Sequence, residues 1–323
     1  MAIASNQRIL TLDLWKLASE IRPGDYLFNN DGQLVQVKSI HPYVSNECYE
    51  VEFDDHVTIC GDKHLAFMLE NPKYRKRLRE YKGVHKFRRP LRRYSVLDIV
   101  ESGENLSMPT TKPLQFPHQD LPIPPFLLGF WFLGKRANKT MVPSPGWSEF
   151  IHQKFKDAGY KITTHRLRMN NEREFKCHPS IESQLAPFIP KKIPAKYLYA
   201  SVEQRIELLS GLVYARRGHY NVKNDEFVFT SKNRELMNQI RFLAESLGSK
   251  TFTIQKKDTG SFVMNFKTYI KLIDTQVSKP LKIHYGRRYI PEIRQVKPQS
   301  CVHIETDGAN NTFLVGEGFI SAC

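Results

Sequence analysis

The sequence predicts a mainly β domain that is interrupted by an inserted α+β domain. Short alternating strands separated by turns fill residues 2 to about 70, and the same pattern returns after Pro291. The region between them carries two copies of a unit that reads as helix, strands and helix, at a spacing of about 80 residues. Because the termini of a domain commonly lie close together, one domain can be inserted into another without disrupting it.

Composition is that of a globular protein with a strongly basic balance. The chain has 323 residues, of which 41% are hydrophobic, enough for about two domains with ordinary cores. Lys and Arg number 48 against 33 Asp and Glu, which gives a net charge of +15. This balance favours a polyanionic partner such as DNA or RNA, because neutralised phosphates release counterions; a solvated basic surface is the alternative.

Eleven of the cations lie between Lys73 and Arg93, where Glu80 is the single acid. The stretch from Glu70 to Ser95 reads as basic and helical, and we expect it to supply a weak DNA contact. The candidate DNA-binding residues are Lys73, Arg75, Lys76, Arg77, Arg79, Arg88, Arg89, Arg92 and Arg93.

The five cysteines are odd in number and include no Cys-x-x-Cys pair, so the sequence predicts neither a disulfide framework nor a zinc site. No apolar run has the length of a signal peptide or of a membrane span. We therefore expect an intracellular monomer with no membrane partner. In a reducing compartment its thiols remain available as nucleophiles.

The strands of the first domain are marked by alternation and by turn residues such as P-G-D and N-D-G. They are expected in R-I-L-T-L, R-P-G-D-Y-L-F, G-Q-L-V-Q-V, C-Y-E-V-E-F and H-V-T-I-C. L-P-I-P-P at 121–125 reads as a stiff linker. We place the N-terminal part of this domain at 2–118 and its C-terminal part at 289–322, where S-C-V-H-I-E-T and N-T-F-L-V-G-E-G-F-I-S supply further strands.

The insert is expected at 119–288. Its first copy begins with F-L-L-G-F-W-F-L-G-K-R at 126–136, and its second with L-L-S-G-L-V-Y-A-R-R-G-H-Y at 208–220. Each is followed by strands and a further helix, so the insert reads as an αββ-type pseudo-dimer.

Four blocks of the first domain resemble an intein, in particular the family of the fungal vacuolar-ATPase intein and the mating-type-switching endonuclease. The blocks are A-I-A-S-N-Q-R-I-L, I-R-P-G-D-Y-L-F, V-T-I-C-G-D-K-H-L-A-F and C-V-H-I-E-T-D-G-A-N-N-T-F-L-V-G-E-G-F-I-S-A-C. The resemblance implies a horseshoe-like Hint fold that splices itself out of a host protein without a cofactor. It puts Ala2 at the position of the splicing cysteine, His64 in the histidine block, and Cys323 at the first residue of the downstream extein.

In such a protein a thiol turns the upstream peptide bond into a thioester, a histidine protonates the departing amine, and a terminal asparagine cyclises. Here Ala2 and Ala322 stand at the two reactive positions and can do neither job. We read the chain as a splicing-blocked precursor made deliberately, with natural decay at both ends as the alternative. Ser321 replaces the histidine that usually precedes the asparagine, so Cys301 and His303 are candidates to assist cyclisation; ordinary strand side chains are the alternative.

The paired repeats resemble the LAGLIDADG motifs of homing endonucleases, in which a carboxylate at the end of each helix holds a divalent metal. Here Gly134 takes that position in the first copy, and Arg216 or Arg217 takes it in the second. The resemblance therefore implies a degenerate nuclease that does not bind Mg²⁺. The alternative function for the whole chain is a site-specific homing endonuclease or DNA-binding protein with a vestigial Hint domain.

Overall fold

The computed structural model describes residues 2–80, 91–134, 140–144, 146–166, 173–177, 192–251, 254–268, 270–272 and 286–323. It divides into two compact units, each with its own hydrophobic core. The first unit is Met1–Gln115 with Lys282–Cys323, and the second is Phe116–Leu281. None of the helices in the described ranges is long and apolar enough to cross a bilayer.

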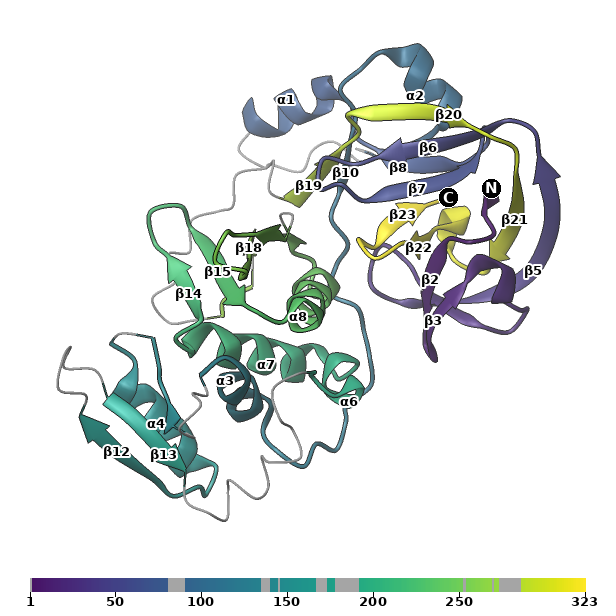
Figure 1. The fold of residues 1–323 in the computed structure, drawn as a ribbon. Helices are drawn as coiled ribbons and strands as arrows, with labels where there is room; N and C mark the ends of the chain where they lie inside the picture. Colours follow the sequence, from purple (N-terminus) through teal and green to yellow (C-terminus); the bar gives the residue numbers. More distant parts are fainter. Residues whose placement is uncertain are drawn as a thin grey trace. The chain divides into compact units, whose positions relative to one another are not determined.

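The first unit is built mainly of strands (Figure 1). Its N-terminal segment supplies β1 (Ala2–Ala4), β2 (Arg8–Thr11), β3 (Leu14–Leu17), β4 (Tyr26–Phe28), β5 (Leu34–Ser45), β6 (Cys48–Glu52), β7 (Thr58–Asp62), β8 (Ala66–Leu69), β9 (Arg92–Ser95) and β10 (Ser107–Pro109). Its C-terminal segment supplies β19 (Arg287–Tyr289), β20 (Glu292–Val296), β21 (Gln299–Thr306), β22 (Phe313–Val315) and β23 (Ile320–Ala322). The helical pieces are η1 (Ala18–Glu20), α1 (Pro72–Glu80), α2 (Val96–Ser102) and η4 (Ala309–Asn311).

Strands from the two segments alternate within one sheet, whose order is β20-β6-β7-β1-β21-β5-β4-β2-β22-β23-β8-β9, with β3 beside β2. The path has two ends, so the described strands form no closed barrel. Side chains such as Ile3, Phe53, Ile304 and Phe313 from both segments share one buried core. Neither segment can bury its apolar face alone, and this explains why the chain must return after the insert.

The chain returns to the first unit at Lys282, and β19 (Arg287–Tyr289) is the first described strand of this segment. Arg287 and Arg288 lie in β19, which pairs with β10. Arg287 Nε lies 2.5 Å from Glu70 Oε2, and Arg288 Nε lies 2.6 Å from Asp55 Oδ2. The two ion pairs, which nothing in the local sequence pattern marks, fix the C-terminal segment to the N-terminal one.

Arg75 differs from its expected role in DNA binding. It lies on α1 but is only 7% exposed, and it donates to Glu70 O at 2.9 Å and to Ser107 Oγ at 2.8 Å. Its guanidinium also lies 5.4 Å from the centre of the Tyr289 ring. Arg75 is thus a structural residue that holds α1 to the sheet.

The second unit contains two similar halves. Its elements are α3 (Pro125–Gly134), β11 (Thr140–Met141), α4 (Ser148–Asp157), β12 (Ile162–Arg166), β13 (Arg173–Cys177), α6 (Ala195–Leu198), α7 (Val202–Tyr214), β14 (Gly218–Asn221), β15 (Glu226–Ser231), α8 (Arg234–Ser246), β16 (Lys250–Thr251), β17 (Gln255–Lys256) and β18 (Phe262–Lys267). One sheet has the order β11-β13-β12 and the other β14-β15-β18-β16, with β17 beside β18.

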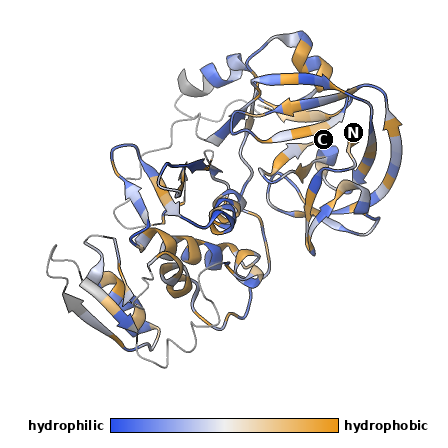
Figure 2. Ribbon diagram, viewed as in Figure 1, coloured by the Kyte–Doolittle hydropathy of each residue, from blue (hydrophilic) through white to orange (hydrophobic). Residues whose placement is uncertain are grey.

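Helix α3 is the centre of this unit. All ten of its residues are buried, and its ribbon is coloured mostly as hydrophobic in Figure 2. A helix that is apolar all round must be covered on every side, and α3 packs closely along α7. Helix α7 begins with a capping box in which Ser201 accepts from Gln204 N, and it ends at Tyr214.

Candidate functional site

The N-terminal strand β1 lies in the interior of the sheet, between β7 and β21. Ile3 pairs with Gly61 of β7, and Ala2 pairs with His303 of β21. Ala2 is 1% exposed. A Cβ atom at Gly61 would lie 2.5 Å from Ala2 O, so only glycine allows β7 to come this close to the first residues.

The C-terminal strand β23 lies between β22 and β8. Ala322 pairs with Phe67 of β8, and Cys323 N–H donates to Ala66 O at 2.9 Å. Both residues are buried. Burial raises the pKa of the Cys323 thiol, and a hydrogen bond with the side chain of Arg93 acts against that rise. The Cys323 thiol, which lies beside β8, is therefore protonated at neutral pH.

The strands that hold the two ends of the chain, β7 and β8, are consecutive in sequence. They are joined by a turn in which Leu65 N–H donates to Asp62 O at 3.0 Å. Ala66 is five positions after Gly61, so these two residues lie at most about 18 Å apart, and the turn brings them closer. Ala2 and Cys323 consequently lie near one another, as the N and C labels of Figure 1 show.

His64 lies in that connecting turn. Its N–H donates to Asp62 Oδ1 at 3.0 Å, which orders the backbone, and its side chain is exposed. The sequence prediction places His64 beside the upstream bond. The structure puts its backbone between β7 and β8, the strands that pair with the two ends of the chain.

Ala2 packs in a small buried cluster with Cys48 and Cys301. The two sulfur atoms are 3.9 Å apart. Burial, with the neighbouring Cys48, raises the pKa of Cys301 to about 12. Beside them Tyr43 OH donates to Asp62 Oδ2 at 2.5 Å, and burial and this carboxylate raise the pKa of Tyr43.

Sequence reasoning missed Cys48, Tyr43 and Asp62. They belong to β5, β6 and β7, and only the pairing of those strands with β1 and β21 brings them to Ala2. Cys301, which it did select, lies opposite Ala4 in the register of β21 with β1.

His303 lies opposite Ala2 on the neighbouring strand β21. It is the register partner of Ala2 and shares a face of β21 with Cys301. It is half-buried, and burial lowers its pKa below the ordinary histidine value, although Glu305 Oε1, 3.5 Å from its Nε2, acts in the opposite direction. At neutral pH its ring is therefore uncharged and able to accept a proton.

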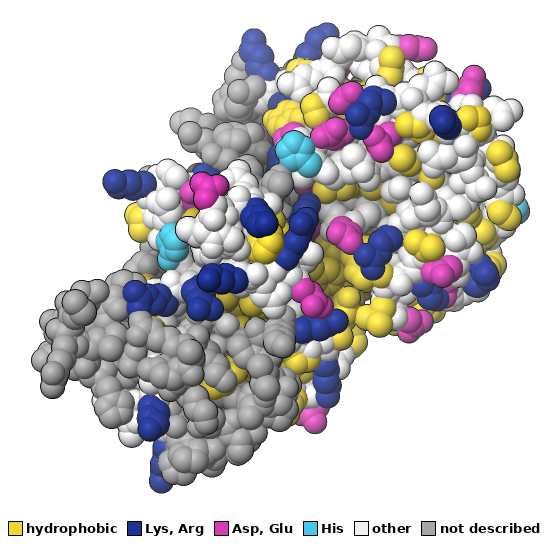
Figure 3. Space-filling model, viewed as in Figure 1, with side chains coloured by type: hydrophobic (Ala, Val, Ile, Leu, Met, Phe, Trp, Pro, Cys, Tyr) yellow, Lys and Arg dark blue, Asp and Glu magenta, His cyan; other side chains and the backbone are white. Residues whose placement is uncertain are grey.

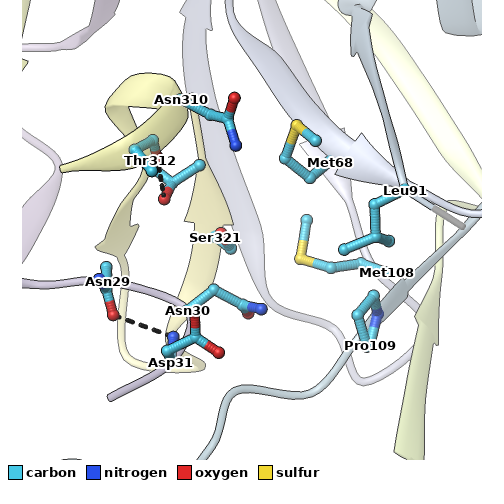
Figure 4. A pocket seen from close by; sticks show the side chains of 11 residues that line it. Asn29, Asn30, Asp31, Met68, Leu91, Met108, Pro109, Asn310, Thr312 and Ser321 are labelled. Carbon is cyan, nitrogen blue, oxygen red and sulfur yellow. Dashed lines mark hydrogen bonds between the residues drawn. The ribbon is translucent and has the colours of Figure 1, made fainter. Parts of the chain in front are cut away.

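Ser321 precedes Ala322 on β23, and side chains alternate between the faces of a strand, so the two point to opposite sides. It faces a cavity of about 160 Å³ lined by Asn30, Met68 and Met108 (Figure 4). Ser321 is 2% exposed, and its Oγ has no hydrogen-bond partner among the described residues. The residues that line this cavity include none of those that form the cluster around Ala2.

The second unit has its own candidate site at the ends of α3 and α7. A Cβ at Gly129 would lie 2.2 Å from Leu208 O, and one at Gly211 would lie 2.0 Å from Phe126 O. These two glycines let the helix backbones touch, and they mark equivalent points of the two helices. Gly134 and Arg216 each lie five residues after them, so Arg216 rather than Arg217 is the equivalent of Gly134.

One residue connects these two helix ends. Val142 N–H donates to Gly134 O at 3.0 Å, and Arg216 N–H donates to Val142 O at 3.0 Å. Neither position offers a carboxylate, and the part of the chain that the structure describes contains no cluster of three His, Cys, Asp or Glu residues able to hold a metal ion. Mg²⁺ binds through oxygen ligands, and neither position supplies the carboxylate that such an ion prefers.

The basic residues that the structure describes include both exposed and buried side chains. Lys73, Lys76, Arg92 and Arg93 are exposed, and Figure 3 shows acidic side chains among the cations of the first unit. Of the other expected DNA-binding residues, Arg75 is buried as described above. The side chains of Arg77 and Arg79, and residues Arg88 and Arg89, lie outside the described residues.

No protein-family model matches the chain. A curated relative, the replicative DNA helicase DnaB of Mycobacterium intracellulare, is 22% identical over 347 aligned residues, which take in 99% of this chain. The chain spans 58% of the length of that relative.

Two solved structures illustrate the similarity. The MchDnaB-1 intein is 26% identical with a TM-score of 0.20, covering 21% of this chain and 52% of its own. The endonuclease I-DmoI, in complex with DNA and Mn, is 15% identical with a TM-score of 0.33, covering 44% of this chain and 88% of its own. Because both TM-scores are below 0.5, the description of the fold rests on the strand pairings given above and not on these two structures. The resemblance to inteins with an endonuclease insert, and the narrower one to fungal vacuolar-ATPase inteins, stay predictions.

Proposed function

We propose that the chain is an intein, a protein-splicing element, whose first unit is the splicing domain. The observation that carries the proposal is the pairing of β1 with β7 and of β23 with β8. These consecutive strands hold Ala2 and Cys323 near each other, buried in one unit. Acyl transfer between two ends of a chain requires such proximity, because the reacting atoms must come within roughly 3 to 4 Å.

The first step belongs to the site around Ala2. With a cysteine at that position, its sulfur attacks the carbonyl carbon of the preceding residue, a C–S bond forms and the C–N bond breaks. His303, the neutral register partner of Ala2, accepts the thiol proton. The released amine takes up a proton, and His64 on the connecting turn is the proposed donor.

The later steps belong to β23. The Cys323 thiol attacks the thioester carbonyl and takes over the upstream chain, with the sulfur at position 2 as leaving group. An asparagine at position 322 then closes on its own main-chain carbonyl and breaks the bond to Cys323. Ala2 has no thiol and Ala322 has no carboxamide, so in this chain the first and the last steps lack their reacting groups. We propose that splicing is blocked at both junctions and needs no cofactor.

The second unit is proposed to be a degenerate homing-endonuclease domain. The glycine contacts between α3 and α7 support the domain type, and they also favour the alternative function, a DNA endonuclease. Gly134 and Arg216 at the helix ends argue against DNA cleavage, because a metal-dependent nuclease needs carboxylates at these positions. We propose weak, salt-sensitive DNA binding through its cations and no metal-dependent cutting.

The partners that this function implies are the flanking segments of a host protein, with DNA as a weaker one. The chain acts as a monomer, because every reacting position lies within one unit, and its place in the cell is that of the host protein.

Restoring the junctions one at a time tests the proposal. The Ala2→Cys chain, preceded by a reporter domain, is expected to release that reporter when a small thiol is added, because the thioester is then open to exchange. The Ala322→Asn chain, followed by a reporter, is expected to release only the downstream one. Mass spectrometry of the fragments identifies the cut bonds, and a cut elsewhere, or none in either chain, would contradict the proposal.

A further inference from the structure

Two thiols that lie far apart in the sequence meet at the N-terminal junction. Cys48 begins β6 and Cys301 lies in β21, 253 residues later, on the other side of the insert. Their sulfur atoms are 3.9 Å apart, and the two side chains are 1% and 0% exposed. Val296 and Ala2 pack against them. The two free thiols are buried and in van der Waals contact, so no other group lies between the two sulfur atoms.

We propose that Cys48 and Cys301 form an oxidisable pair whose disulfide locks the junction around Ala2. The formation of the bond rests on the structure alone. Its effect on splicing rests on the proposed function.

The oxidant must be small, because both side chains are buried, and a peroxide meets that condition. In the first step the Cys48 sulfur attacks one peroxide oxygen, the O–O bond breaks, and Cys48 becomes a sulfenic acid as one water leaves. The Cys301 sulfur then attacks the sulfenic sulfur, the S–S bond forms, and a second water leaves. Two thiols are oxidised by two electrons and one hydrogen peroxide is reduced to two waters.

Closing the bond changes the site. A disulfide has an S–S distance of about 2.05 Å, so the sulfurs must approach by about 2 Å, which side-chain rotation helps to supply. The linked side chains then hold β6 to β21 beside the Ala2 methyl group. A thiol at position 2 would share that cluster and would lose the freedom to reach the carbonyl before it.

The bond itself is tested on the full chain. The protein is treated with hydrogen peroxide, unfolded, alkylated and digested, and peptides whose link is broken by reductant are mapped by mass spectrometry. A linked pair carrying Cys48 and Cys301 is expected, and Cys48→Ala should abolish it. Cys60→Ala removes a half-buried thiol on the adjacent strand β7 and should leave the pair intact. Absence of the linked pair in the unaltered chain, or a link from either cysteine to Cys60, would overturn the proposal.

The effect on splicing is tested separately in a chain carrying Ala2→Cys and Ala322→Asn. The rate after peroxide is divided by the rate after reductant, within each variant, so that a change in basal rate does not matter. We expect at least a tenfold loss that reductant reverses, and a ratio near one when Cys48→Ala is added. An equal loss with Cys48→Ala would show that peroxide acts on the cysteine introduced at position 2. That result would overturn the proposal that the Cys48–Cys301 disulfide blocks the junction. A chain that never splices contradicts the proposed function, while the mapped disulfide stands on its own.

Discussion

At the scale of single residues, Arg288 has a structural role, because it forms a buried ion pair with Asp55, whereas most cations of the chain are expected at the surface. Their side chains are 2% and 0% exposed. Arg288→Met removes the charge that offsets the desolvation of Asp55, and we expect a loss of about 3 kcal/mol in the free energy of unfolding. The matched control is Arg8→Met, which breaks the exposed pair with Glu317 and should cost less than about 1 kcal/mol. Urea unfolding measures both, and equal losses would contradict the burial argument.

His303 gives the residue-scale prediction about pH. Because burial lowers its pKa, the ring stays neutral through about pH 6.5, the usual histidine value, and becomes protonated only below it. Thiol-dependent cleavage of the Ala2→Cys chain should therefore fall off below that pH. His303→Ala should slow cleavage by about 100-fold and remove this inflection. An unchanged pH profile in His303→Ala would show that the histidine is only a strand side chain.

The same protonation affects stability. Folding lowers the pKa of His303, so the unfolded chain binds more protons, and stability rises with pH and is lost as the pH falls below the unfolded value.

At the scale of elements, the helix pair α3 and α7 depends on its two glycines of closest approach. A methyl group at Gly129 would meet the Leu208 backbone oxygen at 2.2 Å, and a backbone cannot rotate away as a side chain does. Gly129→Ala should destabilise the second unit by about 3 kcal/mol. Gly134→Ala in the same helix meets its nearest neighbour at 3.5 Å and should stay within about 0.5 kcal/mol of the unaltered chain. Thermal unfolding followed at the second unit separates the two outcomes, and a tolerated Gly129→Ala would refute the close packing.

Element types could be predicted from the sequence far better than element partners. Alternation and turn residues predicted the strands around β2, β4 and β6, and the repeated glycine marked α3 and α7. The register of Ala2 with His303 could not be predicted, because two strands about 300 positions apart carry no local signal of their pairing. The buried Arg75 was missed for a similar reason: a run of cations reads as surface unless its partners are known. The choice between Arg216 and Arg217 rested on the close approach of Gly129 to the Leu208 backbone and of Gly211 to the Phe126 backbone.

At the scale of the whole molecule, the two units have separate cores. The core of the first unit contains residues such as Ile3 and Ile304, whereas that of the second contains residues such as Trp131 and Leu212. The chain leaves the first unit after Gln115 and returns to it at Lys282. Close to these two points in the sequence, Thr110 N–H donates to Gly286 O at 2.9 Å. Replacing 116–281 by a short Gly/Ser linker should leave a folded first unit. Circular dichroism and cooperative unfolding check this, and loss of the cooperative transition would show that the first unit needs the second.

The central claim is that one unit holds both splice junctions in reach of each other. The most direct measurement places the chain with Ala2→Cys and Ala322→Asn between two reporter domains and follows the products by gel and mass spectrometry. Splicing is defined by the presence of two products, the joined reporters and the excised chain, and by the absence of a separate upstream reporter. We predict that the joined reporters form when both changes are present and never with either alone. Cleaved but unjoined reporters, or an intact precursor with both changes present, would contradict the claim.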